Sequence, residues 1–354
     1  MHLLSLALLC AVQATTPVWG WGEEGHKITG TIAQIHLLPS AQQAICKILP
    51  SDFKCHLANI AVWADTVKRN PKWSWSSELH YVNPEGDNPP EDCTYGEKGW
   101  KNPTENILPE IVNNTGHLFS KTITTQDFAL RFLTHYLGDL HQPFHLTGRA
   151  RGGNRVRVRY QGKSTNLHSA WDGDLIRRRI RTLNNYTSPL PTAPTLPLPP
   201  PILAWNKRIE AALQGSNYDP LVRWVVSEGI HGWWANELED WVKCPQLELQ
   251  DSPEQIVLNG PPFEDPPNLP VCPYAWSVAT HKLLCDFLWS PDFDESDDSD
   301  PVELEKPEYA GRIREMKIVE KQLALGGMRL AAVVNAVFGS EEDKLVFGTW
   351  PKVL

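Results

Sequence analysis

Histidine and aspartate recur in this chain at a spacing that can bind metal ions. His135 and Asp139 are four residues apart, and His168 and Asp172 repeat that interval. Residues four apart on a helix project from one face, so each pair can present an imidazole and a carboxylate together. Neutral imidazole and carboxylate are ligands that suit zinc. A lone histidine would be interpreted as a hydrogen-bonded core residue, but two such pairs favour metal binding.

The segment 132–145, FLTHYLGDLHQPFH, contains two further histidines. Pro143 cannot continue a helix, so His145 is expected just beyond the helix end, where the chain can turn it toward a second metal centre. His141 fits neither pair, and we interpret it as a residue that supports the helix end. One helix end therefore offers ligands to more than one metal.

Other ligand candidates lie closer to the amino terminus. Asp65 has a helical, largely apolar context, where an unpaired carboxylate would be costly. His80 begins the extended stretch HYVN. If the mature chain starts at Trp21, its α-amino group, with a pKa near ~8, and its carbonyl oxygen can chelate a metal beside His26. The candidate ligands are Trp21, His26, Asp65, His80, His135, Asp139, His145, His168 and Asp172.

Residues 1–20 are almost free of charge and rich in leucine, which predicts a secretory signal peptide although no Lys or Arg occurs in it. Cleavage after Ala14 and cleavage after Gly20 both satisfy the sequence rules, and only the second exposes Trp21. No later apolar run reaches the ~20 residues that a bilayer span requires. We therefore expect a secreted, extracellular protein without a membrane-spanning segment.

Without Cys10 of the signal peptide, an even set of six cysteines remains, which suggests disulfides in an exported chain. None has the paired spacing of a zinc ribbon. They are Cys46, Cys55, Cys93, Cys244, Cys272 and Cys285. Asn113 and Asn185 stand in glycosylation sequons.

These side chains must be positioned by a fold that the apolar spacing predicts to be mainly α, with one small β-hairpin. The only clear alternation is RVRVRY, residues 155–160. Three surface loops, near 188–201, 245–270 and 291–308, interrupt helices instead of separating cores, so residues 21–354 are expected to form a single domain. Helices are predicted at 31–38, 40–49, 57–69, 104–119, 126–140, 167–180, 203–213, 221–242, 275–288 and 309–338.

Charge is concentrated in one stretch. The chain carries a formal charge of −9, but residues 291–308 hold nine carboxylates and one lysine, which leaves about −1 for the rest. A polyanionic substrate is therefore not excluded, because bound zinc ions would add positive charge at the site. We interpret a basic strip as the solvated face of the hairpin, an interpretation slightly favoured over the alternative that the strip contacts the substrate. It comprises Arg149, Arg151, Arg155, Arg157, Arg159 and Lys163.

Taken in order, the motifs WGxxGH, WAD, HYVN, HxxxDxHQPxH and NLHxxWD resemble the zinc-dependent, single-strand-specific nucleases of fungi and plants. The resemblance implies their helical, phospholipase C-like fold and three zinc ions. One zinc would be held by Asp65, His80, His135 and Asp139. A second would take the amino group and carbonyl of Trp21 with His26 and share Asp139. The third would take His145, His168 and Asp172.

The resemblance also implies hydrolysis of phosphodiester bonds in single-stranded DNA and RNA to 5′-phosphates, with 3′-nucleotidase activity, because zinc lowers the pKa of bound water toward ~7. Asp65 and Asp139 would act in catalysis with Lys68, whose alternative is an ordinary surface lysine. Tyr81 falls where the family stacks a base, and Asn83 where many members carry an aspartate. By the same resemblance Cys93 pairs with Cys244. Cys46–Cys55 and Cys272–Cys285 are then the local pairs that remain.

Two alternatives stay open. A zinc-dependent phospholipase C uses a similar order of ligands, although its set usually ends in glutamate where this chain has Asp172. The other is a secreted zinc-binding protein without catalysis. The expected partners are single-stranded nucleic acid and nucleotides, with no protein partner and no membrane, and the expected state is a monomer.

Overall fold

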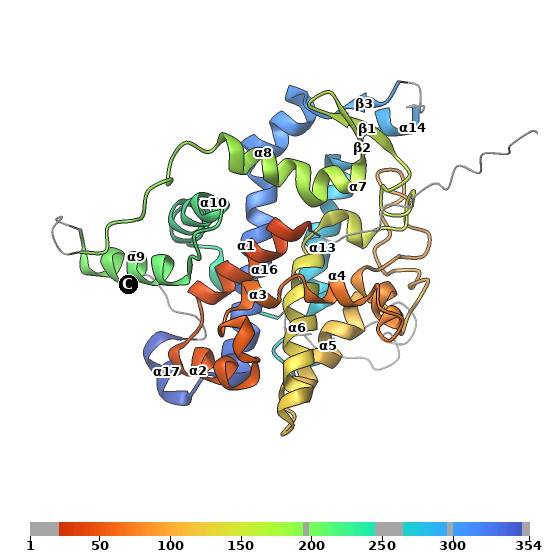
Figure 1. Cartoon of the computed structure of the whole chain (residues 1–354). Coiled ribbons are helices and arrows are strands. Elements are labelled where there is room, and N and C mark those ends of the chain that lie inside the picture. Colours follow the sequence, from red (N-terminus) through yellow and green to blue (C-terminus); the bar gives the residue numbers. More distant parts are fainter. Residues whose placement is uncertain (1–20, 194–197, 245–264, 296–299, 349–354) are drawn as a thin grey trace, which may run out of the picture.

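The computed structural model describes residues 21–193, 198–244, 265–295 and 300–348. Figure 1 shows helices gathered around a central bundle, with a small sheet at one edge. The bundle is formed by α1 (Glu23–Ile35), α6 (Ile123–Asp139) and α16 (Ile318–Phe338), which pack against one another. The expected mainly α fold with a small hairpin is confirmed.

Helix α6 follows the predicted pattern closely. The apolar side chains of Leu133, Tyr136 and Leu137 are fully buried, and the helix ends at Asp139. Pro143 then begins a short 3₁₀ turn, Pro143–Leu146, which contains His145. The prediction that His145 lies just beyond the helix end is therefore confirmed.

Helix α1 begins at Glu23, eight residues before its predicted start at residue 31. The N-terminal turn carries Glu23 and Glu24, whose negative charges favour a helix start through the helix dipole. Glycines and polar residues interrupt the helical spacing of apolar residues in this turn, so the sequence did not predict it as helix. The approach of α1 to α16 is close, since a Cβ added to Gly327 would lie 2.5 Å from Ile32. The absence of a side chain at Gly327 thus allows α1 and α16 to pack closely in the core.

The other predicted helices are present, several of them divided into shorter segments. Residues 170–174, 225–233, 284–288 and 307–311 form π-helical turns within them. The remaining helices are α2 (Pro39–Ile48), α3 (Leu57–Ile60), α4 (Trp63–Val67), α5 (Ile107–Leu118), α7 (Leu167–Ser169), α8 (Leu175–Thr182), α9 (Pro200–Ala212), α10 (Asp219–Trp224), α11 (Leu238–Val242), α13 (Pro273–Leu283), α14 (Asp292–Glu295), α15 (Arg312–Glu315) and α17 (Glu341–Phe347), with 3₁₀ segments at Ser51–Phe53 and Ser74–His80.

The sheet has three strands in the order β2-β1-β3. Strands β1 (Arg157–Tyr160) and β2 (Lys163–Asn166) form the expected antiparallel hairpin, and β3 (Val302–Glu303) pairs parallel to β1. The Glu303 carboxylate accepts hydrogen bonds from the backbone N–H groups of the hairpin turn at residues 161 and 162. The acidic stretch 291–308 was predicted to be a surface loop, but it also contains α14 and β3.

The disulfides differ from the predicted pairs. Cys93 is bonded to Cys285 and Cys244 to Cys272, with Cα–Cα distances of 6.1 and 5.5 Å. The predicted Cys93–Cys244 and Cys272–Cys285 bonds are therefore wrong. Cys272 immediately precedes α13, and Cys285 lies two residues after its last residue, in the π-helical turn that continues it. The helix therefore holds them on the order of 20 Å apart at 1.5 Å per residue, beyond the reach of a disulfide.

The third predicted pair is not formed either, since Cys46 and Cys55 are free thiols. Cys55 hydrogen-bonds to Cys46, and burial, followed by this contact, raises the pKa of Cys46 to about 11. The two cysteines are neighbours without a covalent bond.

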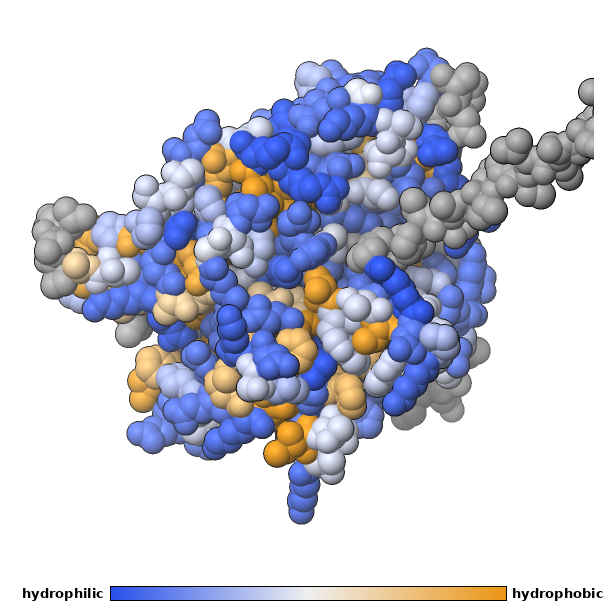
Figure 2. Space-filling view, in the orientation of Figure 1, coloured by the Kyte–Doolittle hydropathy of each residue, from blue (hydrophilic) through white to orange (hydrophobic). Residues whose placement is uncertain are grey.

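Figure 2 shows one face of the molecule, which is largely hydrophilic with apolar residues scattered in small groups. Within the described ranges, the helices are too short or too polar to span a bilayer.

Candidate metal centre

Eight of the predicted ligands come together from seven separate elements. His26 lies on α1, Asp65 on α4, His80 at the end of the 3₁₀ segment Ser74–His80, and His135 and Asp139 on α6. The turn after α6 adds His145, while α7 and the π-helical turn that follows it add His168 and Asp172. All eight side chains are buried, none with more than 6% exposure. Burying so many ionisable groups is costly unless they are paired or bind metal.

Asp139 occupies the centre of the group. Its Oδ2 lies 2.9 Å from His80 Nδ1 and 3.1 Å from His135 Nε2. Its Oδ1 lies 3.2 Å from His26 Nε2. The two oxygens of one carboxylate thus face different imidazoles, the arrangement needed for a side chain that bridges two ions.

Asp65 completes this part of the centre. Its Oδ1 lies 3.5 Å from His135 Nε2, 3.7 Å from His80 Nδ1 and 2.6 Å from Lys68 Nζ. Two sets of ligand atoms are compact enough to hold an ion, namely His26–Asp65–His135 and His80–His135–Asp139, with the atoms of each set within 4.8 Å of one another. The structure thus groups His26 with Asp65 as well as with Asp139.

The third set, His145, His168 and Asp172, is equally compact. His168 Nε2 lies 3.5 Å from Asp172 Oδ2. The segment that carries Asp172 is a π-helical turn and not the α-helix we predicted; such turns occur often at functional sites. Gln142 donates a hydrogen bond of 2.7 Å to Asp172 Oδ1 and was missed by the sequence reasoning, although it stands within the HQPxH motif.

Backbone carbonyls orient three of the imidazoles. Nδ1 of His135 lies 2.7 Å from the carbonyl oxygen of Ala61, Nδ1 of His145 is 2.6 Å from that of His80, and Nδ1 of His168 is 2.6 Å from that of Gly152. An Nδ1–H that donates to a carbonyl leaves Nε2 as the metal-binding nitrogen. The tautomers required of metal ligands are therefore set by the surrounding chain.

The electrostatics of the centre favour a cation. Burial lowers the pKa of His135, but Asp139 and Asp65 more than offset it and raise that pKa to about 10. Burial also raises the pKa of Asp172 well above its usual value, and repulsion from Asp139 adds to it. In addition, the ring nitrogens of His26 and Nε2 of His80 have no hydrogen-bond partner among the described residues. Divalent ions at these sets would satisfy both the carboxylates and the imidazoles.

His141 is structural, as predicted. Its Nδ1 lies 2.6 Å from the carbonyl oxygen of Leu137, and Arg329 donates a hydrogen bond of 2.6 Å to Nε2. Both nitrogens are therefore engaged outside the metal sets.

A pocket of about 170 Å³ adjoins the third set at His168. Tyr81 and Asn83, which we predicted to contact the substrate, line it together with Lys101 and Arg151. Of the basic strip only Arg151 borders this pocket, whereas Arg149 and Arg159 form ion pairs with acidic residues. Lys101 was not singled out from sequence, because nothing in the chain around it marks a site.

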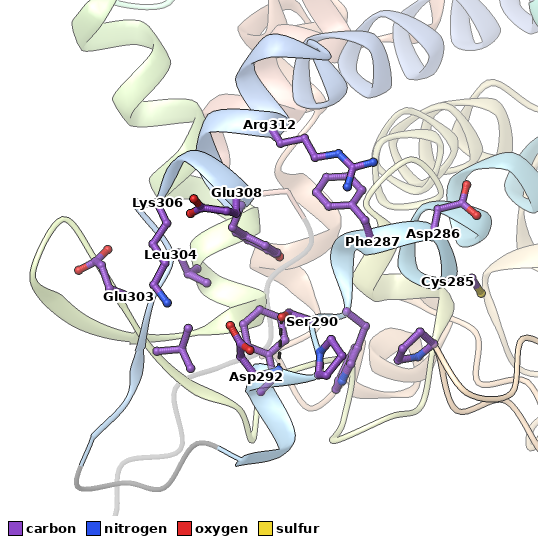
Figure 3. A pocket seen from close by; sticks show the side chains of 16 residues that line it. Cys285, Asp286, Phe287, Ser290, Asp292, Glu303, Leu304, Lys306, Glu308 and Arg312 are labelled. Carbon is purple, nitrogen blue, oxygen red and sulfur yellow. Dashed lines mark hydrogen bonds between the residues drawn. The ribbon is translucent and has the colours of Figure 1, made fainter.

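A larger pocket, of about 390 Å³, lies away from the metal centre beside β3 and α14. Its rim carries Asp286, Asp292, Glu303 and Glu308 but only two cations (Figure 3). The excess of carboxylates is unfavourable for a phosphate. The smaller, basic pocket is the one suited to an anionic substrate.

Known proteins match the chain, several of them over almost its whole length. A family model described as S1/P1 nuclease matches residues 21–339. Endonuclease 4 of Arabidopsis thaliana is 29% identical over 334 residues, which cover 91% of this chain and 90% of that protein. Nuclease P1 of Penicillium citrinum is 26% identical over 328 residues, covering 92% of this chain and all of that protein. Nuclease S1 of Aspergillus oryzae is 34% identical over 173 residues, 49% of this chain and 59% of that protein.

Proposed function

Because the chain belongs to the S1/P1 nuclease family, we propose that it is a zinc-dependent endonuclease that hydrolyses phosphodiester bonds of single-stranded DNA and RNA. Its products carry 5′-phosphates, and 3′-nucleotides are also dephosphorylated. The single observation that carries this proposal is the buried Asp139 carboxylate, whose two oxygens face His26 on one side and His80 with His135 on the other.

Three zinc ions fit the residues present. We assign the first to Asp65, His80, His135 and Asp139, the second to Trp21 and His26 with a shared Asp139, and the third to His145, His168 and Asp172. When bound, these ions supply a water nucleophile of lowered pKa and neutralise charge on the phosphate. Gln142 keeps Asp172 oriented through its hydrogen bond to Oδ1.

We assign Lys68 the role of stabilising the negative charge that develops on the leaving group. It lies at the end of α4 with only 12% of its side chain exposed, and its Nζ is 2.6 Å from Asp65 Oδ1. A positioned cation in a water-poor site stabilises charge more strongly than one in solvent. The contact with Asp65 keeps the ammonium beside the metal sets.

Base recognition is assigned to the smaller pocket. Tyr81 offers a ring for stacking, which requires an unpaired base and tolerates base identity. Its hydroxyl is held by Glu78. Lys101 and Arg151, which also line the pocket, provide positive charge for a phosphate.

Removal of residues 1–20 would make Trp21 the amino terminus. Its side chain is fully buried, and the N–H of the next residue, Gly22, donates a 2.6 Å hydrogen bond to the carbonyl oxygen of Asp172. This bond holds the start of the chain beside the ligands. The two disulfides and the exposed Asn113 and Asn185 sequons are consistent with an exported protein.

Purified protein should be incubated with single-stranded DNA, RNA, duplex DNA, a 3′-nucleotide and phosphatidylcholine vesicles. Cleavage of the single strands to 5′-phosphorylated products that is abolished by a chelator supports the proposal. Hydrolysis of the vesicles alone would identify a phospholipase C instead. Full zinc content without any hydrolysis would identify a zinc-binding protein without catalysis.

A further inference from the structure

An aromatic cluster lies beside the metal centre and has no part in the functions assigned above. Trp73 and Trp75 belong to the segment that leads to His80, and their rings are 5.9 Å apart. Both contact Phe132 on α6, at 5.9 Å. Trp75 is 57% exposed, so a large apolar ring faces solvent on a rigid aromatic support.

This cluster is continuous with the metal ligands along one face of α6. Phe128, Phe132, His135 and Asp139 follow at intervals of four, three and four, which places them in one stripe. Phe128 packs against Trp73, and His135 faces the carboxylates. The stripe therefore has an aromatic end and a metal-binding end.

The separation between these ends suits a nucleic acid strand. Trp75 contacts Phe132, which lies three residues, about 4.5 Å of α-helix, before His135. The five residues of 3₁₀ helix from Trp75 to His80 span about 10 Å. A strand with stacked bases covers this distance in about three nucleotides at ~3.4 Å each.

The charge of the surroundings is complementary to such a strand. Residues 66–77 contain Lys68, Arg69 and Lys72; of the flanking carboxylates, Asp65 pairs with Lys68 and Glu78 accepts a hydrogen bond from the Tyr81 hydroxyl. Lys72 is exposed, and no ion pair of its side chain occurs among the described residues. Exposed aromatics alternating with cations are the usual means of binding single strands without sequence preference.

We propose that Trp75, supported by Trp73, stacks a base of the single-stranded substrate about three nucleotides from the phosphodiester that is cleaved. The inference rests on the proposed nuclease function and adds a second base contact, carried by the segment that precedes His80, whereas Tyr81 follows it. It explains how a strand longer than the pocket can be held unpaired over the metal centre. Short substrates would not reach this ring.

The test compares Trp75→Ala, Trp75→Phe and wild type on an eight-nucleotide DNA strand and on a 3′-nucleotide. Removing a stacking ring costs ~1 to 3 kcal/mol per base, so Trp75→Ala should lower kcat/KM on the eight-mer about 5- to 140-fold, at about 1.4 kcal/mol per tenfold. Its activity on the 3′-nucleotide should stay within about twofold of wild type, and Trp75→Phe should retain most of the eight-mer activity. Trp233→Ala removes another exposed tryptophan, with 46% exposure, and should leave both activities unchanged.

Equal kcat/KM values for Trp75→Ala and wild type on the eight-mer would overturn the inference while leaving the nuclease function intact. A parallel loss on both substrates would also overturn it, because it would indicate damage to the centre. If wild type cleaves no strand, the proposed function fails instead. Binding of a phosphorothioate eight-mer, measured by fluorescence anisotropy, then decides. Weaker binding by Trp75→Ala than by wild type supports the base contact at Trp75, and equal binding refutes it.

Discussion

Asp139→Asn is the substitution that tests the bridged centre most directly. Asparagine keeps the shape of the side chain but removes its charge. In the structure the carboxylate oxygens lie 2.9 to 3.2 Å from the ring nitrogens of His26, His80 and His135, so two ions bound there would both lose a negative ligand. Two unit charges 4 Å apart interact by about 4 kcal/mol at an effective dielectric constant near 20. At about 1.4 kcal/mol per tenfold, affinity should fall roughly a thousandfold or more for each ion.

We therefore expect Asp139→Asn to lose at least one zinc of the close pair and all measurable nuclease activity. The zinc held by His145, His168 and Asp172 should remain, because only one oxygen of Asp139 approaches that set, at 3.9 Å from His145 Nδ1. Metal analysis of dialysed protein and single-strand cleavage measure both effects.

Asp127→Asn is the matched control. Asp127 lies on the same helix, is also buried, at 8% exposure, and pairs with Arg131 through hydrogen bonds of 2.8 and 2.5 Å. This variant should lose stability, by about 1 to 3 kcal/mol, and keep its zinc and activity at low temperature. If Asp139→Asn retains three zinc ions and normal rates, the bridging role of Asp139 is refuted.

Four further predictions follow from the contacts described. Lys68→Ala should keep all three zinc ions and lose turnover, whereas loss of zinc would make Lys68 a structural partner of Asp65. Gln142→Leu should weaken zinc binding at the third site about 10- to 100-fold, measured by competition with a chelator; unchanged affinity would contradict its positioning role. Active mature protein should begin at Trp21, as amino-terminal sequencing will show, and a fully active protein that begins earlier would remove the amino ligand. Burial lowers the pKa of His36 to about 4, below its value of ~6.5 in the unfolded chain. Neutral His36 therefore adds about 3 kcal/mol to the free energy of unfolding above pH ~6.5, and this is lost as the pH falls toward 4. The free energy of unfolding of His36→Asn should depend less steeply on pH than that of wild type, and an identical slope would refute this.

Much of the centre could be predicted from sequence because its ligands lie on short, regular segments. The four-residue spacing of His135 and Asp139 fixes their common face on any helix, and Pro143 ends that helix wherever it packs. Alternation at residues 155–160 similarly predicted β1. These properties depend on local chain geometry, so they needed no knowledge of distant residues.

Local spacing did not decide which distant groups meet. The contact of His26 with Asp139 joins α1 to α6, and only the resemblance of the combined motifs to a known family, not the spacing within either segment, predicted it. The disulfide partner of Cys93 depended on the length and direction of α13, and β3 emerged from an acidic stretch because Glu303 caps the hairpin turn. Pairings between residues far apart in the chain are set by how whole helices pack, whereas periodicity and spacing report only on each helix by itself.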